Sequence, residues 1–275
     1  MSTRASAPTP VVKSIALSSG VTLRYVEQGE RSGVPVLFLH GFTDSWRSFE
    51  LVLPHVPTSI RAVALTQRGH GDADRPATGY RTRDFATDVA EVVERLGLAP
   101  VVIVGHSMGS TNAERFAIDH PARTRGLVLA ASFASYRRNP AVMEFWQSGV
   151  SQLTDPIDPA FVREFQESTL AIEVPREIVD KAVEESLKVP ARVWRAAFGG
   201  FLEDDFAEEI GKITAPTLAL WGDRDALVPR ADQDVFLKNM AGSRLLVYHG
   251  HGHAPHWEDP ARFAADLGAF ARELA

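Results

Sequence analysis

The chain has 275 residues, enough for one large core with an inserted subdomain, and its apolar share of 45% and charged share of 23% are ordinary for a globular protein. It contains no cysteine, which excludes disulfides, thiol catalysis and thiolate metal sites. Residues 1–10 are rich in Ser, Thr, Ala and Pro and are expected to form a disordered tail, not a signal peptide or anchor. Since no run is long enough for a membrane-spanning helix, we expect a cytoplasmic protein without a membrane partner.

Along the chain, short apolar runs alternate with helical patterns. Residues 11–17 and 21–27 predict a hairpin, and further strands are predicted at 35–40, 60–66, 101–104, 124–131, 216–221 and 243–248. Helices are predicted at 45–53, 82–96, 107–120, 231–240 and from 259 onward. This alternation predicts an α/β fold, with a mostly parallel, twisted sheet of eight strands and helices on both faces.

The alternation stops in residues 133–213, which show helical patterns and no strand. We expect this segment to be a helical cap between two parts of the core, residues 1–132 and 214–275. It holds nine Lys and Arg against fifteen Asp and Glu, a net charge of −6 that disfavours polyphosphate substrates and nucleic acid.

The same segment contains ten of the 24 aromatic residues of the chain. Some are expected to roof an apolar pocket, and more than half to pack within the cap itself. They are Phe133, Tyr136, Phe145, Trp146, Phe161, Phe165, Trp194, Phe198, Phe201 and Phe206.

One serine stands in a distinctive local pattern. The run Gly105-His106-Ser107-Met108-Gly109 follows a predicted buried strand and opens a predicted helix. A Gly-x-Ser-x-Gly at such a joint places the serine in a tight turn with its hydroxyl exposed, while the glycines let neighbouring backbone approach. The pattern occurs once, so Ser107 is the predicted nucleophile.

A serine nucleophile needs a base and a group that orients the base. In a doubly wound sheet both should follow later strands, in the order acid and then histidine. Gly222-Asp223-Arg224-Asp225 follows the strand at 216–221, and His249-Gly250-His251-Gly252-His253 follows the strand at 243–248. Titratable side chains therefore stand where such sheets bind ligands.

With these segments in view, the chain resembles the α/β-hydrolase superfamily, specifically its cap-bearing esterase and haloperoxidase-like members, from about residue 11 to the C-terminus. The resemblance implies that Ser107 is the nucleophile, Asp225 in a Gly-Asp-x-Asp-x-x-x-Pro pattern the acid, and His253 in a His-x4-Glu-x-Pro pattern the base. It also implies an oxyanion hole made by the backbone N–H groups of Phe42, which follows a His-Gly pair, and Met108.

Neighbouring residues compete for these roles. Asp223 is the rival of Asp225, but Gly-Asp readily starts turns, and the family pattern favours Asp225. Some superfamily members carry the acid one strand earlier, yet residues 127–139 contain no Asp or Glu.

The extra histidines His249, His251 and His256 are rivals of His253 and are expected to lie in a solvated loop. A zinc site in the His-x-His run is disfavoured, because no carboxylate or cysteine ligand is near. We therefore expect no metal and no cofactor.

Two further features receive structural interpretations. His40 and His106 are expected to pack or to fix loops by hydrogen bonds, in preference to gating the pocket. Arg68-Gly69-His70-Gly71 resembles a glycine-containing loop of the family, but Gln67 lies where the family often has an acid. No Gly-Lys-Ser/Thr follows, so the loop is not expected to bind phosphate.

The main hypothesis is hydrolysis of carboxylic esters of neutral, moderately apolar small molecules through an acyl-enzyme on Ser107. Serine at this position disfavours epoxide opening and dehalogenation, which need an aspartate in this family. Lactone cleavage, C–C hydrolysis and perhydrolysis with the same three residues stay open, as does a ligand sensor with slow turnover. The acyl and alcohol groups and the oligomeric state do not follow from the sequence.

Overall fold

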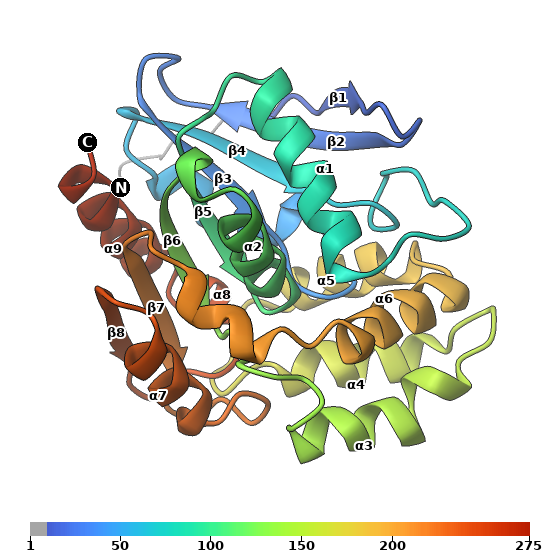
Figure 1. Cartoon of the computed structure of the whole chain (residues 1–275). Helices are drawn as coiled ribbons and strands as arrows, with labels where there is room; N and C mark the ends of the chain where they lie inside the picture. Colours follow the sequence, from blue (N-terminus) through green and yellow to red (C-terminus); the bar gives the residue numbers. More distant parts are fainter. Residues whose placement is uncertain (1–9) are drawn as a thin grey trace, which may run out of the picture.

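The computed structural model describes residues 10–275 and has an eight-stranded sheet at its centre (Figure 1). The strand order is β1-β2-β4-β3-β5-β6-β7-β8. β1 and β2 form an antiparallel hairpin, β2 pairs antiparallel with β4, and all other neighbours are parallel. The strands are β1 (Lys13–Ala16), β2 (Thr22–Gln28), β3 (Val34–Leu39), β4 (Ile60–Thr66), β5 (Val101–His106), β6 (Thr124–Ala130), β7 (Thr217–Gly222) and β8 (Ser243–Tyr248).

Helices cover both faces of this sheet. On one face pack α1 (Thr82–Arg95), α2 (Met108–Asp119) and α7 (Arg230–Asn239), whose apolar side chains share a buried cluster with the sheet. On the other face pack α9 (Pro260–Glu273) and the 3-10 helices η1 (Trp46–Phe49) and η2 (Leu53–His55). The remaining short helices are η3 (Pro121–Arg123), η4 (Val150–Gln152), η5 (Ala207–Lys212) and α8 (Pro255–Glu258).

The central strands are apolar without alternation because both of their faces are covered. Every residue of β5 and β7 is buried. Parallel strands end at the same edge of a sheet, so the loops after β3, β5, β7 and β8 gather at one place. The fold thereby brings distant parts of the chain to one edge.

Between β6 and β7 the chain forms four α-helices, here called the inserted helices: α3 (Pro140–Ser148), α4 (Pro159–Ser168), α5 (Arg176–Leu187) and α6 (Ala191–Glu203). α3 and α4 begin at proline, and the side chains of Asn139 and Asp158 cap them by accepting backbone N–H groups. The inserted helices lie together at one end of the sheet (Figure 1). Their apolar side chains form a buried cluster around Trp194, which also includes Phe85 of α1, Met108 of α2 and Trp221 of β7.

The predicted α/β fold with a mostly parallel eight-stranded sheet is confirmed. One predicted element is wrong: residues 45–53 form no α-helix, and two short 3-10 helices stand there instead. Pro54 lies inside the second one, and it lacks the N–H that a continuous α-helix through this segment would donate to the carbonyl of Glu50. The division into core and cap stays a prediction, and residues 1–9 of the predicted tail lie outside the described residues. Among residues 10–275, no helix combines the length and the apolar character needed to cross a membrane.

Candidate active site

Ser107 lies at the sharp turn between β5 and α2. Its backbone angles, φ 51° and ψ −116°, are strained for a residue other than glycine. The glycines on both sides permit close packing, since a Cβ on Gly109 would lie 2.1 Å from the carbonyl oxygen of Leu39, and one on Gly105 2.4 Å from Cα of Ser110. Packing of α2 against β3 and β5 therefore holds the strained turn in place.

His253 and Asp225 form a buried pair. His253 Nδ1 lies 2.9 Å from Asp225 Oδ2, and their side chains are 4% and 0% exposed. Asp225 follows β7, and its Oδ1 accepts the backbone N–H groups of Leu227 at 2.8 Å and Val228 at 2.9 Å. A carboxylate beside Nδ1 keeps the proton on that nitrogen and leaves Nε2 as a proton acceptor.

The environment of Asp225 keeps it ionised. Burial alone would raise the pKa of this carboxyl, but the nearby His253 and the two backbone N–H groups outweigh it and hold the pKa below its usual value. Asp223, the rival acid, lies elsewhere: its carboxylate contacts the exposed His249 at 2.8 Å and the N–H of Gly250 at 2.6 Å. The structure thus brings His253 to Asp225 and not to Asp223.

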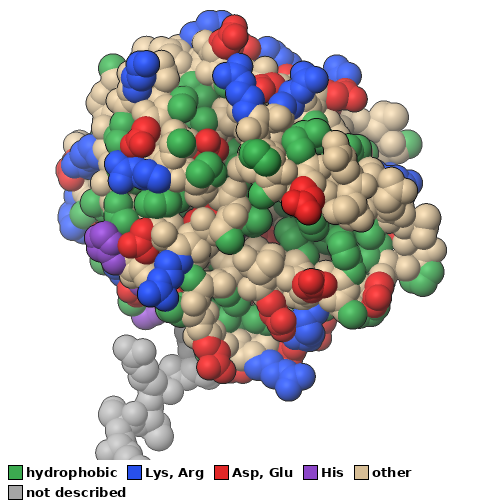
Figure 2. All heavy atoms as spheres, turned by 90° about the horizontal axis from the view of Figure 1, so that it is seen from below, with side chains coloured by type: hydrophobic (Ala, Val, Ile, Leu, Met, Phe, Trp, Pro, Cys, Tyr) green, Lys and Arg blue, Asp and Glu red, His purple; other side chains and the backbone are tan. Residues whose placement is uncertain are grey.

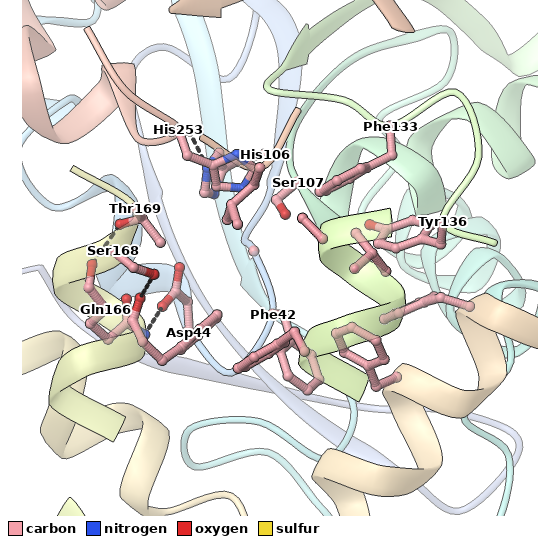
Figure 3. Close-up of a pocket in the computed structure, with 18 of the residues that line it drawn as sticks. Phe42, Asp44, His106, Ser107, Phe133, Tyr136, Gln166, Ser168, Thr169 and His253 are labelled. Atoms are coloured by element: carbon pink, nitrogen blue, oxygen red, sulfur yellow. Dashed lines mark hydrogen bonds between the residues drawn. The ribbon is translucent and has the colours of Figure 1, made fainter. Parts of the chain in front are cut away.

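Ser107 and His253 line one cavity (Figure 3). Its volume is about 800 Å³ when the space in its open mouth is included. Among the described residues, the hydrogen bond between His253 and Asp225 is formed, whereas none joins the Ser107 hydroxyl to His253 Nε2. Seen from the side of the inserted helices, a hollow opens among apolar side chains, with acidic groups nearby (Figure 2).

Six of the ten aromatic residues in segment 133–213 line this cavity: Phe133, Tyr136, Phe145, Phe165, Phe198 and Phe201. Nine of the ten also pack in the apolar cluster around the inserted helices, Phe206 being the exception. The expectation that more than half contribute to packing within this segment is therefore confirmed, and the six rings that line the cavity do both.

The loop after β3 is held by His40. Its Nε2 accepts the N–H of Gln67 at 3.0 Å, so the proton sits on Nδ1, which donates to the carbonyl of Gly41 at 2.8 Å. The C=O and N–H of a trans peptide point in opposite directions, so this bond fixes where the Phe42 N–H points. Among the described residues, neither the Phe42 nor the Met108 N–H donates a hydrogen bond within the chain.

Gln67, which departs from the family pattern, also stabilises this loop. Its side chain donates to the carbonyl of His40 at 3.0 Å and accepts from Asn112 of α2 at 2.7 Å. The amide thus ties the loop after β3 to the helix that follows Ser107.

His106 confirms the expectation of a loop-fixing histidine. Its Nε2 donates to the carbonyl of His253 at 2.9 Å, and burial together with the nearby His253 lowers the pKa of His106 to about 3. The neutral ring therefore holds the backbone of His253 without adding charge.

The expectation that His256 lies in a solvated loop is wrong. It is 0% exposed, its Nε2 lies 3.0 Å from Ser48 Oγ, and its ring centroid lies 4.3 Å from that of His106. Pro255 begins α8, which places His256 against η1 instead of in the loop. His249 and His251 lie nearer the surface.

The loop that carries His253 is fastened to the segment after α4. The backbone N–H of His253 donates to the carbonyl of Thr169 at 2.8 Å. Glu258 accepts the N–H groups of Ala171 and Gly252, both at 2.6 Å, and so joins the two segments. The inserted helices therefore contribute to the position of His253.

Two polar residues of the cavity, Asp44 and Gln166, were not expected from the sequence. Asp44 stands four residues after His40 in the loop after β3, where side chains of a parallel sheet meet ligands, and that position was the signal available. Gln166 lies on α4 without any sequence signal.

Comparison with known proteins identifies the family. The family model of the alpha/beta hydrolase fold matches residues 34–260, most of the chain. The chain belongs to this family.

Its relatives include enzymes of several activities. It is 29% identical to the non-heme chloroperoxidase of Streptomyces lividans over 94% of this chain and 99% of that protein. The solved structure of the esterase EaEST from Exiguobacterium antarcticum has a TM-score of 0.85 and 25% identity, covering 94% and 98% of the two chains. Est816, described as an N-acyl homoserine lactone degrading enzyme, has a TM-score of 0.77 and 28% identity, covering 93% and 99%. The predicted superfamily with its esterase and haloperoxidase-like members is confirmed, and these matches support a hydrolase enzyme.

Proposed function

We propose that this protein is a serine hydrolase that cleaves carboxylic esters of small, moderately apolar molecules through an acyl-enzyme on Ser107. The observation that carries the proposal is that Ser107 and His253 line a single cavity, and that His253 Nδ1 lies 2.9 Å from the buried carboxylate of Asp225. The likeness to the esterase EaEST supports the same reaction class.

In the first half of the reaction, His253 Nε2 takes the proton of the Ser107 hydroxyl as its oxygen attacks the ester carbonyl. Hydrogen bonds between a nucleophile and its base often tighten only when substrate binds, so we expect the Ser107 hydroxyl and His253 Nε2 to come into contact in the complex with the ester. The proton then passes from His253 to the departing alcohol, and the acyl group stays on Ser107.

Negative charge develops on the carbonyl oxygen during the attack. The N–H groups of Phe42 and Met108 are the proposed donors to that oxygen, and one such donor is worth on the order of 10²–10³ in rate. Met108 is the first residue of α2, so the positive end of the helix dipole favours the same charge.

In the second half, His253 takes a proton from a water molecule that attacks the acyl-enzyme, and the acid is released with Ser107 restored. The reaction as written uses only side chains and backbone groups of this chain and needs no cofactor. We propose that residues 133–213 act as the cap, because they supply six of the eight Phe, Tyr and Trp side chains that line the cavity.

A lactone is the second candidate substrate, since it contains the same ester bond within a ring and Est816 is a structural relative. C–C hydrolysis, perhydrolysis and a sensor with slow turnover would use the same residues.

The test is turnover of p-nitrophenyl butyrate, with a lactone and a β-diketone in parallel, by the wild type and by Ser107→Ala. Steady ester hydrolysis that Ser107→Ala abolishes supports the esterase. A single burst without turnover indicates a sensor, and turnover of the diketone alone assigns C–C hydrolysis.

A further inference from the structure

The cavity has two chemically different sides, and Ser107 lies between them (Figure 3). On one side stand the rings of Phe133 and Tyr136, and on the other stand Asp44, Gln166 and Ser168. An ester whose carbonyl sits at Ser107 has two substituents, so one is directed toward the aromatic side and the other toward the polar side. We call the second side the Asp44 corner, formed by Asp44, His106, Gln166, Ser168 and Thr169.

Asp44 accepts hydrogen bonds from neutral groups only. Its Oδ1 lies 3.2 Å from Gln166 Nε2 and its Oδ2 lies 3.1 Å from Ser48 Oγ. Asp44 is buried, with only 5% of its surface exposed. Among the described residues, no Lys or Arg forms an ion pair with its carboxylate. A carboxylate can accept about four hydrogen bonds, so Asp44 has capacity left on the side of the cavity.

The neighbouring groups add acceptors to the corner and no free donor. Gln166 Nε2 also contacts Ser186 Oγ at 2.9 Å, so its two hydrogens are used. The hydroxyl of Ser168 donates to the carbonyl of Phe165 at 2.7 Å, and that of Thr169 donates to the carbonyl of Gln166 at 2.7 Å. Both hydroxyls therefore offer only lone pairs to a ligand.

His106 supplies a buried acceptor without a partner. Its Nε2 donates to His253, so Nδ1 carries a lone pair, and this atom has no hydrogen bond. A Cβ placed on Gly41 would lie 2.7 Å from His106 Nδ1 and 3.3 Å from Asp44 Oδ2. The two acceptors therefore face space that is open because residue 41 is a glycine. A buried acceptor without a hydrogen-bond partner lowers the stability of the folded protein.

We propose that the Asp44 corner binds a hydrogen-bond donor on one substituent of the ester substrate, and that a protonated amine fits it best. Acceptors without donors select for such a group, and a charged donor to a carboxylate makes the stronger bond. The net charge of −6 in residues 133–213 also attracts cations, and so it favours the same kind of ligand. The inference rests on the proposed esterase function and replaces the expected neutral substrate by one with an apolar arm and an amine-bearing arm.

The ionisation of Asp44 makes the proposed preference for an amine depend on pH. Burial raises the pKa of Asp44 to about 7, against the lowering by Gln166, Ser48 and the nearby His253, while Glu185 raises it further. The buried His106 and His256, which also pack near this loop, are held neutral because burial lowers their pKa values. Asp44 therefore gains its charge as the pH rises through about 7.

The experiment compares isosteric esters in a pH-stat. Isoamyl butyrate and dimethylaminoethyl butyrate differ only by replacement of a C–H with a protonated N–H, and phenyl isocaproate and phenyl dimethylaminopropionate place the same change on the acyl arm. We expect wild-type kcat/KM to favour the amine ester in one of the two pairs by about tenfold or more. Because both esters of a pair need His253 equally, their ratio cancels its titration, and the ratio should rise between pH 6 and 8.

Asp44→Asn keeps the shape of the side chain and removes its charge, and we expect it to reduce the preference to about twofold or less with no rise between pH 6 and 8. Asp223→Asn, a carboxylate outside the cavity, should retain the wild-type preference and its pH dependence. A wild-type ratio near one in both pairs, or a ratio unchanged by Asp44→Asn, overturns the proposal. If Asp44→Asn does not fold, the pH dependence of the wild-type ratio decides.

The same esters separate failure of this inference from failure of the proposed function. If no ester is turned over, calorimetric binding of each pair to Ser107→Ala still compares the amine with its isostere. Tighter binding of the amine ester, by about tenfold, supports the corner, and equal binding or no binding overturns it.

Discussion

The edge of the sheet and the inserted helices contribute different things to one cavity. The sheet edge carries the proposed reactive groups: Ser107 follows β5, Asp225 follows β7 and His253 follows β8. The inserted helices carry Gln166 and four of the eight Phe, Tyr and Trp side chains in the lining: Phe145, Phe165, Phe198 and Phe201. Strand ends are rigid and place atoms to within fractions of an ångström, whereas exchangeable side chains on helices shape the space above them. We therefore expect variants at the sheet edge to change kcat and variants on the inserted helices to change KM.

The largest effect is expected at the sheet edge. Asp225→Asn should lower kcat by about 10⁴, because an amide beside His253 Nδ1 favours the wrong tautomer and does not stabilise the imidazolium. Asp223→Asn is the matched control, since that carboxylate contacts only the exposed His249 loop. Steady-state kinetics of both variants with p-nitrophenyl butyrate checks this, and near wild-type activity in Asp225→Asn would remove Asp225 from the proposed catalytic residues.

On the inserted helices we expect a binding effect instead. Phe198 lines the cavity and its ring stacks on Trp146 with a centroid distance of 5.8 Å. Phe198→Ala should raise KM for apolar esters by about tenfold and leave kcat within about threefold, because the ring contacts ground state and transition state alike. Phe206→Ala removes a buried ring that does not line the cavity and should leave KM unchanged. An equal loss of kcat and kcat/KM in Phe198→Ala would contradict the division of roles.

The sheet edge and the inserted helices also differ in how well the sequence predicts them. Ser107, Asp225 and His253 stand in short local patterns at predicted strand ends, so the fold class and these residues could be named before any coordinates. Asp44 and Gln166 meet only because the loop after β3 and α4 pack together, and no local pattern records that contact. His256 was misplaced for a similar reason: its burial depends on Ser48, 208 residues away in the chain.

A smaller effect is expected where the two regions are joined. Glu258→Gln keeps the acceptor for one backbone N–H but weakens the charge-assisted bonds to Ala171 and Gly252. We expect kcat to fall by about threefold to tenfold as the loop of His253 loosens, with KM nearly unchanged. Hydrogen exchange of residues 249–253 measures that loosening directly. A loss of activity without faster exchange would mean that Glu258 acts on the reaction itself.

The smallest effect concerns stability at the boundary between the two regions. Glu114 of α2 is buried there, and its Oε1 accepts from Ser132 Oγ at 2.6 Å. Burial raises its pKa to about 8, with the nearby Asp232 adding to the shift. An acid whose folded pKa lies above its unfolded value contributes fully to the free energy of unfolding at low pH, and this contribution is lost as the pH rises toward 8.

Glu114→Gln removes this titration while it keeps the acceptor for Ser132. The free energy of unfolding in urea should therefore be similar for wild type and variant at pH 5 and higher in the variant by about 2 kcal/mol at pH 8.5. Glu94→Gln, at a side chain that is 77% exposed, should show no such divergence, and a difference that stays constant with pH would place the effect in packing and not in charge.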